Sequence, residues 1–395
     1  MKKVLAIILI FTITILCGLY FYKKYKFQIF IHNIKEYVNL EDYYIYGNHL
    51  NIKINNNTKE KLILKSIDNE LEYELIIEDN KNVLSKNINE GINLEKIDNG
   101  KYYLLIKKGN NYYGIKNNSN YSKTNYYTFN NKKITISSDK MTYLNVKNSK
   151  ENYYDIVIDA GHGGNDTGAI NGSYYESYYT LRYATSLAEK LKTLGYKVKL
   201  TRDSDDGIKT YGKNSRTAIP YEAHAKYVFS IHFNSSEDYI YQSGVEIYCP
   251  NKANLDFAKD IVKNIVNKTS IDYSTNTAFK KDKGIYVRTF RDSEIKYMNE
   301  QADNNNYKHY NITNETPYLY MIRETGGKIT HAYTDGRNKK TGANPYYNSN
   351  IGVEAYLLEL GYINNSKDLE IIKTEKDKYI NAIAYSIDKH IKNNT

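Results

Sequence analysis

The chain has 395 residues, of which 41% are hydrophobic and 25% are charged, and this composition is typical of a globular rather than a disordered protein. The formal net charge of +10 favours anionic surroundings, but no zinc-finger spacing or RNA-binding signature accompanies it, so nucleic acid is not an expected partner. Cys17 and Cys249 are the only cysteines, which excludes a disulfide framework.

Residues 1–27 are expected to form an N-terminal membrane anchor. The uncharged run VLAIILIFTITILCGLYF follows two lysines and has the length of a membrane-spanning helix. A cleaved signal peptide followed by secretion is the alternative, but the run is long for that role and no small-residue cleavage site follows it. The sequence therefore predicts a single-pass protein of the cell membrane, with the cytoplasmic membrane as the partner of this helix.

Residues 28–46 are expected to be a short stalk, and residues 47–137 a small all-β domain of the sandwich type. Short β-type runs such as HLNIKIN, KLILKSI and KYYLLIKK recur there, separated by clusters of Asn, Asp and Gly. No catalytic constellation is visible in this module. It is interpreted as a spacer, with a binding module as the alternative, and residues 138–152 are expected to link it to the next domain.

Residues 153–395 alternate between strand and helix patterns, which predicts a layered α/β domain. Strands are expected at YYDIVIDAG, KYVFSIHFN and AYLLELGY, and helices at LRYATSLAEKLKTLGY and LDFAKDIVKNIVNK. The chain closes with a helix that begins near the capping box TEKD. Residues 276–350 are polar, rich in Asn and Tyr and poorly periodic, so they are expected to form a long insertion near one rim.

Three residues at the ends of these strands have side chains suited to chemistry. His162 stands among glycines in DAGHGGND, and His232 stands in FSIHFN. Glu359 lies inside the apolar run AYLLELGYINN, where an ionised carboxylate is costly unless a cation, a metal or a bound water compensates it. Each residue alone has a structural interpretation, such as an ion pair between Glu359 and Arg202. Two imidazoles and a carboxylate together can form an open zinc site.

The motifs, taken in order, resemble those of the zinc-dependent N-acetylmuramoyl-L-alanine amidases. The matching stretches are IVIDAGHGGNDTGAINGSYYE, LTR, SIHFN, GVEIY and LLELGYINN, within residues 153–270 and 350–393. The resemblance implies a mixed twisted sheet flanked by helices. It also implies hydrolysis of the amide between N-acetylmuramic acid and L-alanine in bacterial peptidoglycan. Because polymerised peptidoglycan lies outside the cytoplasmic membrane, a catalytic domain on the extracytoplasmic side is expected.

The same resemblance assigns roles to four residues. It places the family's Zn²⁺ ligands on His162, Glu176 and His232, and the family's catalytic carboxylate on Glu359. Tyr362 stands where the family usually has Phe, a change that keeps an aromatic ring. In this role Glu359 takes a proton from the attacking water and delivers it to the departing amine.

Several alternatives stay open at this point. Glu222, Glu246 and Glu354 compete with Glu176 for the position of the carboxylate ligand, and Asp166 could instead orient a histidine ring. The chain could also be a zinc peptidase that cuts within stem or cross-bridge peptides, or a relative that binds the wall without catalysis. The insertion is hypothesised to gate the substrate groove.

Overall fold

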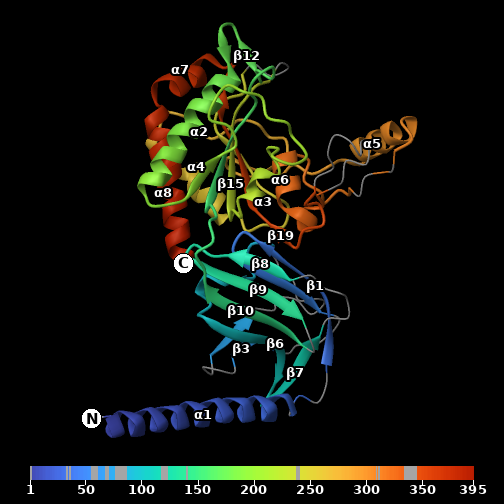
Figure 1. Cartoon of the computed structure of the whole chain (residues 1–395). Coiled ribbons are helices and arrows are strands. Elements are labelled where there is room, and N and C mark those ends of the chain that lie inside the picture. Colours follow the sequence, from blue (N-terminus) through green and yellow to red (C-terminus); the bar gives the residue numbers. More distant parts are fainter. Residues whose placement is uncertain are drawn as a thin grey trace. The chain divides into compact units, whose positions relative to one another are not determined.

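The structure is a computed structural model, drawn for the whole chain in Figure 1. It describes residues 2–32, 34, 37–54, 61–66, 71–75, 87–116, 123–138, 141–236, 241–307, 309, 312–332 and 345–395. The chain divides into two compact units. The first unit comprises Met1–Tyr43, Ile52–Ser85 and Ile97–Ser149, and the second comprises Tyr44–Asn51, Lys86–Lys96 and Lys150–Thr395.

In its described residues the first unit contains the helix α1 (Lys2–His32) and mainly antiparallel strands. The strands are β3 (Lys61–Ser66), β4 (Glu72–Leu75), β6 (Gly100–Lys108), β7 (Asn111–Lys116), β8 (Thr124–Tyr127), β9 (Lys132–Ser138) and β10 (Thr142–Asn148). β3 pairs with β4 and β6, and β6 continues through β10 and β9 to β8. β10 falls in the range that was expected to be a linker. A sandwich fold and a spacer role for this part of the chain stay predictions.

The prediction of a membrane anchor is wrong. Crossing a bilayer requires a helix of about 20 predominantly apolar residues, because the hydrocarbon core is about 30 Å thick. Among the described residues, no helix combines the length and the apolar character that this requires. The expected single-pass cell-membrane location, with the N-terminal helix held in the cytoplasmic membrane, is therefore corrected.

A mixed seven-stranded sheet forms the centre of the second unit, in the order β14-β11-β15-β20-β16-β18-β17. β14, β11, β15 and β20 run parallel, whereas β16 is antiparallel to β20. The bounds are β11 (Ile156–Ala160), β14 (Val198–Leu200), β15 (Tyr227–Asn234), β16 (Glu246–Tyr248), β17 (Lys280–Asp282), β18 (Ile285–Tyr286) and β20 (Glu354–Tyr362). The expected α/β domain with a mixed sheet is confirmed.

Helices cover both faces of this sheet (Figure 1). On one face lie α2 (Glu176–Thr193), α4 (Asp256–Lys268) and α8 (Lys376–Asn394), and on the other lie the shorter α3 (Ile219–Glu222) and α6 (Tyr320–Thr325). α7 (Ser366–Thr374) precedes α8. The helices of the first face form because apolar residues recur at every third or fourth position, as Leu187 and Leu191 do in α2, and this stripe is buried against the sheet.

The range 276–350 contributes to the sheet and to the core. It contains β17, β18, α5 (Asp292–Asn304), α6 and the 3₁₀ helix η2 (Gly327–Thr330). Met321 and Ile322 of α6 are buried in one apolar cluster with Val228 of β15 and Leu357 of β20. Because these side chains fill the core beneath the sheet, α6 is an integral part of the domain.

Two short segments from the first third of the chain also belong to the second unit. Strand β1 (Tyr37–Tyr46) ends by pairing with β19 (Ile351–Gly352), with Ile45 opposite Ile351. β2 (His49–Ile54) begins by pairing with β5 (Ile92–Asn93), just before the 3₁₀ helix η1 (Leu94–Lys96). The α/β unit is therefore assembled from three stretches of sequence, two of which lie in the ranges expected as stalk and β module.

Candidate metal centre

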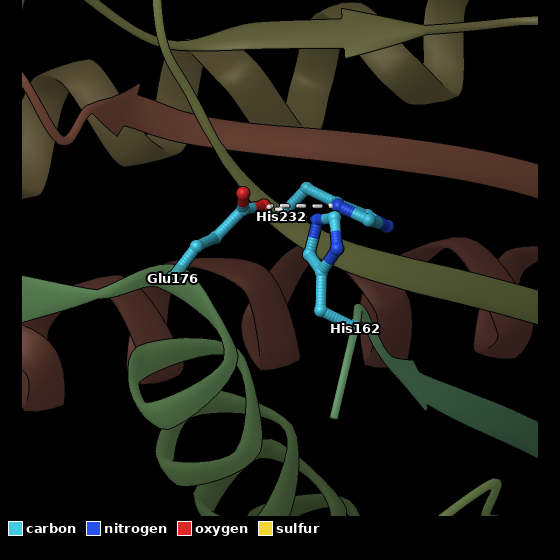
Figure 2. Close-up of side chains that lie close together, drawn as sticks. All are labelled: His162, Glu176 and His232. Carbon is cyan, nitrogen blue, oxygen red and sulfur yellow. Dashed lines mark hydrogen bonds and ion pairs between the residues drawn. The ribbon is translucent and has the colours of Figure 1, made fainter. Parts of the chain in front are cut away.

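Three predicted residues meet at the carboxyl-end edge of the parallel strands (Figure 2). His162 follows β11 by two residues, Glu176 is the first residue of α2, and His232 lies near the end of β15. Neighbouring parallel strands end at the same edge of a sheet, so the neighbours β11 and β15 bring the two histidines together. The hairpin β12 (Ile170–Asn171) and β13 (Tyr174–Tyr175) returns the chain to this edge and leads directly into Glu176.

The three side chains converge on one carboxylate oxygen. Glu176 Oε1 lies 3.1 Å from His162 Nε2 and 3.0 Å from His232 Nδ1. One potential ligand atom from each residue lies within 4.8 Å of the other two. The imidazole rings have centroids 4.9 Å apart and meet edge to face. No other group of this kind, with three or more His, Cys, Asp or Glu ligand atoms, occurs among the described residues.

Glycines make room for this arrangement. A Cβ on Gly161 would lie 2.4 Å from His232 Cε1, and one on Gly168 would lie 2.6 Å from Glu176 Oε2. Gly168 also has a φ of +65°, a backbone conformation that residues other than glycine rarely adopt. Any residue larger than glycine at these two positions would displace the cluster.

Asp166 holds the His162 ring from its other side. Asp166 Oδ1 lies 2.9 Å from His162 Nδ1 and also accepts a hydrogen bond from the backbone N–H of Gly168. Burial by itself would lower the pKa of His162, but the hydrogen bonds and charges of Glu176 and Asp166 outweigh it and raise the pKa. The orienting interaction that the sequence left open for Asp166 is thus present.

Glu176 is buried yet well supplied with donors. Its Oε1 accepts from the backbone N–H of Phe233 and its Oε2 from that of Ala169. Burial would raise the pKa of Glu176, but hydrogen bonds from both histidines outweigh burial and lower it strongly. The carboxylate is therefore kept charged, as a ligand for a cation must be.

The residues present fit a divalent metal ion. Two imidazoles and one carboxylate are the ligand set of an open zinc site, which leaves a coordination position for substrate or water. His232 Nδ1 lies 3.0 Å from Glu176 Oε1, so this ring presents one nitrogen to the cluster. Asp166 supplies the carboxylate that commonly orients a metal-binding histidine.

Glu359 lies in line with this cluster. In the pairing of β15 with β20, His232 is directly opposite Glu359, and in the pairing of β16 with β20, Glu246 is directly opposite Glu359. Residues directly opposite each other point to the same face of a sheet. His232, Glu359 and Glu246 therefore form a row across three adjacent strands.

The environment of Glu359 favours a protonated carboxyl group. Its side chain keeps partial exposure, but Oε2 is buried and has no hydrogen-bond partner among the described residues. Burial first, and then the charges of Glu176 and Glu246, raise the pKa of Glu359 well above its usual range. A carboxyl group with a raised pKa holds a proton more tightly than an exposed one does, which a general acid requires.

The ion pair between Glu359 and Arg202, the structural alternative for Glu359, is not formed. Arg202 instead donates to the backbone carbonyls of Ala160 and Gly161, next to the His162 turn. Arg216 likewise braces this turn, because it donates to the carbonyl of His162. Both arginines stabilise the backbone that carries the cluster.

The competing carboxylates lie elsewhere. Glu222 is exposed and accepts from the backbone N–H of Asn214. Glu354 stands at the start of β20, whereas Glu359 stands near its end, and Glu354 accepts from Asn89 Nδ2 at 2.8 Å. Glu246 is completely buried in β16 and accepts four hydrogen bonds. None of the three belongs to the metal-ligand group.

Sequence reasoning missed the environment of Glu246. Its four donors come from Asn234, Tyr248, Ser274 and Tyr362, which are spread over more than a hundred residues of sequence. The available signal was Tyr362 itself, a hydroxyl at a position where the family usually has Phe. A buried hydroxyl needs a partner, and a carboxylate on the neighbouring strand provides it.

Comparison with known proteins matches residues 156–393 to a family model described as N-acetylmuramoyl-L-alanine amidase. This match covers more than half of the chain and includes all four residues predicted for the site. The chain belongs to the N-acetylmuramoyl-L-alanine amidase family. The resemblance inferred from the motifs is confirmed.

Individual relatives match over stretches of different lengths. N-acetylmuramoyl-L-alanine amidase CwlM of Bacillus licheniformis is 39% identical over 93 residues, which are 22% of this chain and 36% of CwlM. A putative N-acetylmuramoyl-L-alanine amidase of Buchnera aphidicola (strain APS) is 26% identical over 240 residues, covering 60% of this chain and 93% of that protein. The match to the uncharacterized protein YqiI of Bacillus subtilis covers 63% of YqiI, so this chain spans less than two thirds of both YqiI and CwlM.

Among solved structures, the catalytic domain of the amidase CwlV from Bacillus (Paenibacillus) polymyxa is similar, with 23% sequence identity and a TM-score of 0.41. The match covers 60% of this chain and 98% of that domain.

Proposed function

We propose that this chain is a zinc-dependent hydrolase that cleaves the amide between N-acetylmuramic acid and L-alanine in bacterial peptidoglycan. Peptidoglycan is the proposed binding partner of the chain because it is the substrate. The proposal rests on membership of the amidase family together with one observation, the convergence of His162, Glu176 and His232 beside Glu359.

His162, Glu176 and His232 would hold the Zn²⁺ ion. A bound zinc ion supplies Lewis acidity, which polarises the amide carbonyl and makes water more acidic. Asp166 fixes the orientation of the His162 ring through Nδ1, which leaves Nε2 directed at Glu176. The charged Glu176 would balance part of the positive charge of the ion.

Glu359 is the proposed catalytic acid and base. As water adds to the carbonyl carbon, the carboxylate of Glu359 accepts a proton, and it then donates this proton to the nitrogen as the carbon–nitrogen bond breaks. The raised pKa of Glu359 suits the second step, because the carboxyl group must hold the proton until the amine departs. Among the described residues, no other group hydrogen-bonds to Oε2 and competes for this proton.

The test is digestion of purified peptidoglycan by the full chain loaded with zinc, with Glu359→Gln as the matched control. The expected products, identified by mass spectrometry, are intact stem peptides that carry a free L-alanine amine. Glu359→Gln should form them about 10²- to 10⁴-fold more slowly, the usual contribution of a general acid and base.

Other products would identify a different function. Fragments cut inside the stem or the cross-bridge would replace the amidase with a zinc peptidase. Binding of peptidoglycan without any cleavage by the zinc-loaded chain would overturn the enzymatic proposal altogether.

A further inference from the structure

The Glu246 carboxylate is surrounded by hydrogen-bond donors. Its Oε1 accepts from Ser274 Oγ at 2.6 Å and from Tyr362 Oη at 2.6 Å. Its Oε2 accepts from Tyr248 Oη at 2.8 Å and from Asn234 Nδ2 at 3.2 Å. No salt bridge to Glu246 occurs in the described part of the chain, so these four hydrogen bonds compensate its burial.

Two of these donors stand on the strands that carry the candidate catalytic residues. Asn234 follows His232 by two residues on β15, and Tyr362 follows Glu359 by three residues on β20. Glu246 itself stands on β16, directly opposite Glu359. The Glu246 carboxylate, on β16, therefore accepts hydrogen bonds from residues of β15 and β20, at the edge of the sheet where the candidate site lies.

The pairing of β15 with β20 is irregular at this edge of the sheet. The register between β15 and β20 shifts after the His232–Glu359 pair, so the next paired residues are Asn234 and Tyr362. Gly361 has a φ of +138° within this irregular stretch. Glu359 is thus the last residue of β20 in regular register with β15, and nothing hydrogen-bonds its Oε2 among the described residues.

We propose that Glu246 is a positioning residue for Glu359, acting through its hydrogen bonds to Tyr362 and Asn234. By fixing the strand ends on both sides of the register shift, Glu246 keeps the Glu359 carboxyl in the row with His232. This inference rests on the proposed amidase function, because positioning has meaning only if Glu359 transfers a proton.

The test compares Glu246→Gln with Glu354→Gln in the zinc-loaded full chain. Both residues are completely buried carboxylates that accept from tyrosine and asparagine side chains, but Glu354 lies at the far end of β20 from Glu359. Turnover of a soluble muramoyl peptide, bound zinc per chain and the thermal unfolding midpoint are measured for each variant. The last two measurements do not depend on activity.

For Glu246→Gln we expect kcat to fall at least tenfold, with KM and bound zinc within twofold of the wild-type values. Glu354→Gln should leave kcat within twofold. Tyr362→Phe, which removes one of the four donors, should lower kcat by about threefold. In the double variant Glu246→Gln/Tyr362→Phe, kcat should be less than twofold below that of Glu246→Gln alone, because both substitutions affect the same hydrogen bond.

Two results would overturn the inference while leaving the amidase intact. One is a kcat for Glu246→Gln within twofold of wild type, and the other is a loss of kcat that only follows an equal loss of zinc or of folded protein. If Glu246→Gln does not fold, Tyr362→Phe and Tyr248→Phe decide, and unchanged kcat in both would overturn it. A wild-type chain that releases no product would instead overturn the proposed function, and this inference with it.

Discussion

Gly161 and His232 lie so close together that no side chain fits between them. A Cβ added to Gly161 would stand 2.4 Å from His232 Cε1, well inside the contact distance of two carbon atoms. The position of the His232 imidazole in the metal-ligand group therefore requires a residue without a side chain at position 161.

Gly161→Ala is expected to weaken metal binding and to destabilise the fold. The methyl group must push the His232 ring away from Glu176 or strain the backbone, and overpacking of this kind costs about 1–3 kcal/mol. Zinc affinity should fall at least about tenfold, because the displaced ring loses its place in the ligand set. Isothermal titration with zinc and urea unfolding measure the two effects. Gly18→Ala, where a Cβ meets nothing within 4 Å, is the control.

Asp166→Ala is expected to lower zinc affinity or turnover by about 10- to 100-fold. The substitution removes the acceptor that lies 2.9 Å from His162 Nδ1, so the ring loses the partner that fixes its orientation. The same titration measures the affinity. Asp205→Ala is the control because the Asp205 side chain is 74% exposed and its ion-pair partner is Arg202, at 3.8 Å. Equal affinities and equal turnover of the two variants would show that Asp166 serves only the turn.

Glu354 is expected to make the stability of the chain fall as pH rises. Burial raises the pKa of Glu354 to about 7 from its ordinary 4.5, against the hydrogen bonds from Tyr356 and Asn89. The folded chain therefore binds this proton more tightly than the unfolded chain does. The resulting stabilisation is fully present below pH 4.5 and is lost as pH rises through 7, and it amounts to about 3 kcal/mol.

Glu354→Gln tests this linkage, because glutamine keeps the shape and cannot ionise. The difference in unfolding free energy between variant and wild type should shift by about 3 kcal/mol in favour of the variant between pH 4.5 and pH 8. Urea unfolding at several pH values gives this difference. A difference that stays constant with pH would mean that Glu354 titrates alike in the folded and unfolded chain.

Local patterns in the sequence predicted the strands that form β11, β15 and β20, but not β17 and β18, which lie in the range expected to be a poorly periodic insertion. The assignment of Glu176 as a ligand came from the family resemblance. Apolar runs that end in Gly, His or Glu identify strand ends, and parallel strand ends meet at one edge. Long-range pairings were not visible in this way. Nothing in the periodicity of residues 44–51 indicates that Ile45 lies opposite Ile351, because the pairing depends on the partner strand.

The buried network of Glu246 was hidden for the same reason. Its four donors acquire their role only when β15, β16 and β20 are adjacent, which no local window contains. For the N-terminal run, a local pattern gave a wrong prediction. An uncharged stretch of suitable length predicted a membrane anchor, but among the described residues no helix meets the requirement for one.

The range 276–350 offers the sharpest contrast between a removable insertion and a part of the core. Met321 is 1% exposed and belongs to the apolar cluster beneath β15 and β20, whereas Tyr297 of α5 is 61% exposed. Met321→Ala is expected to reduce the free energy of unfolding by about 2–5 kcal/mol, since it leaves a cavity in a packed core. Tyr297→Ala should change it by no more than about 0.5 kcal/mol.

Deletion of the whole range is therefore a poor test of whether it gates the groove, because loss of α6 would unfold the domain. Substitutions on the exposed side of α5 examine gating while the core stays intact. Faster cleavage of peptidoglycan by such variants, with an unchanged unfolding midpoint, is the result expected of a gate. Should Met321→Ala instead unfold at the wild-type urea concentration, α6 would not belong to the core, and the whole range would again be open to a gating role.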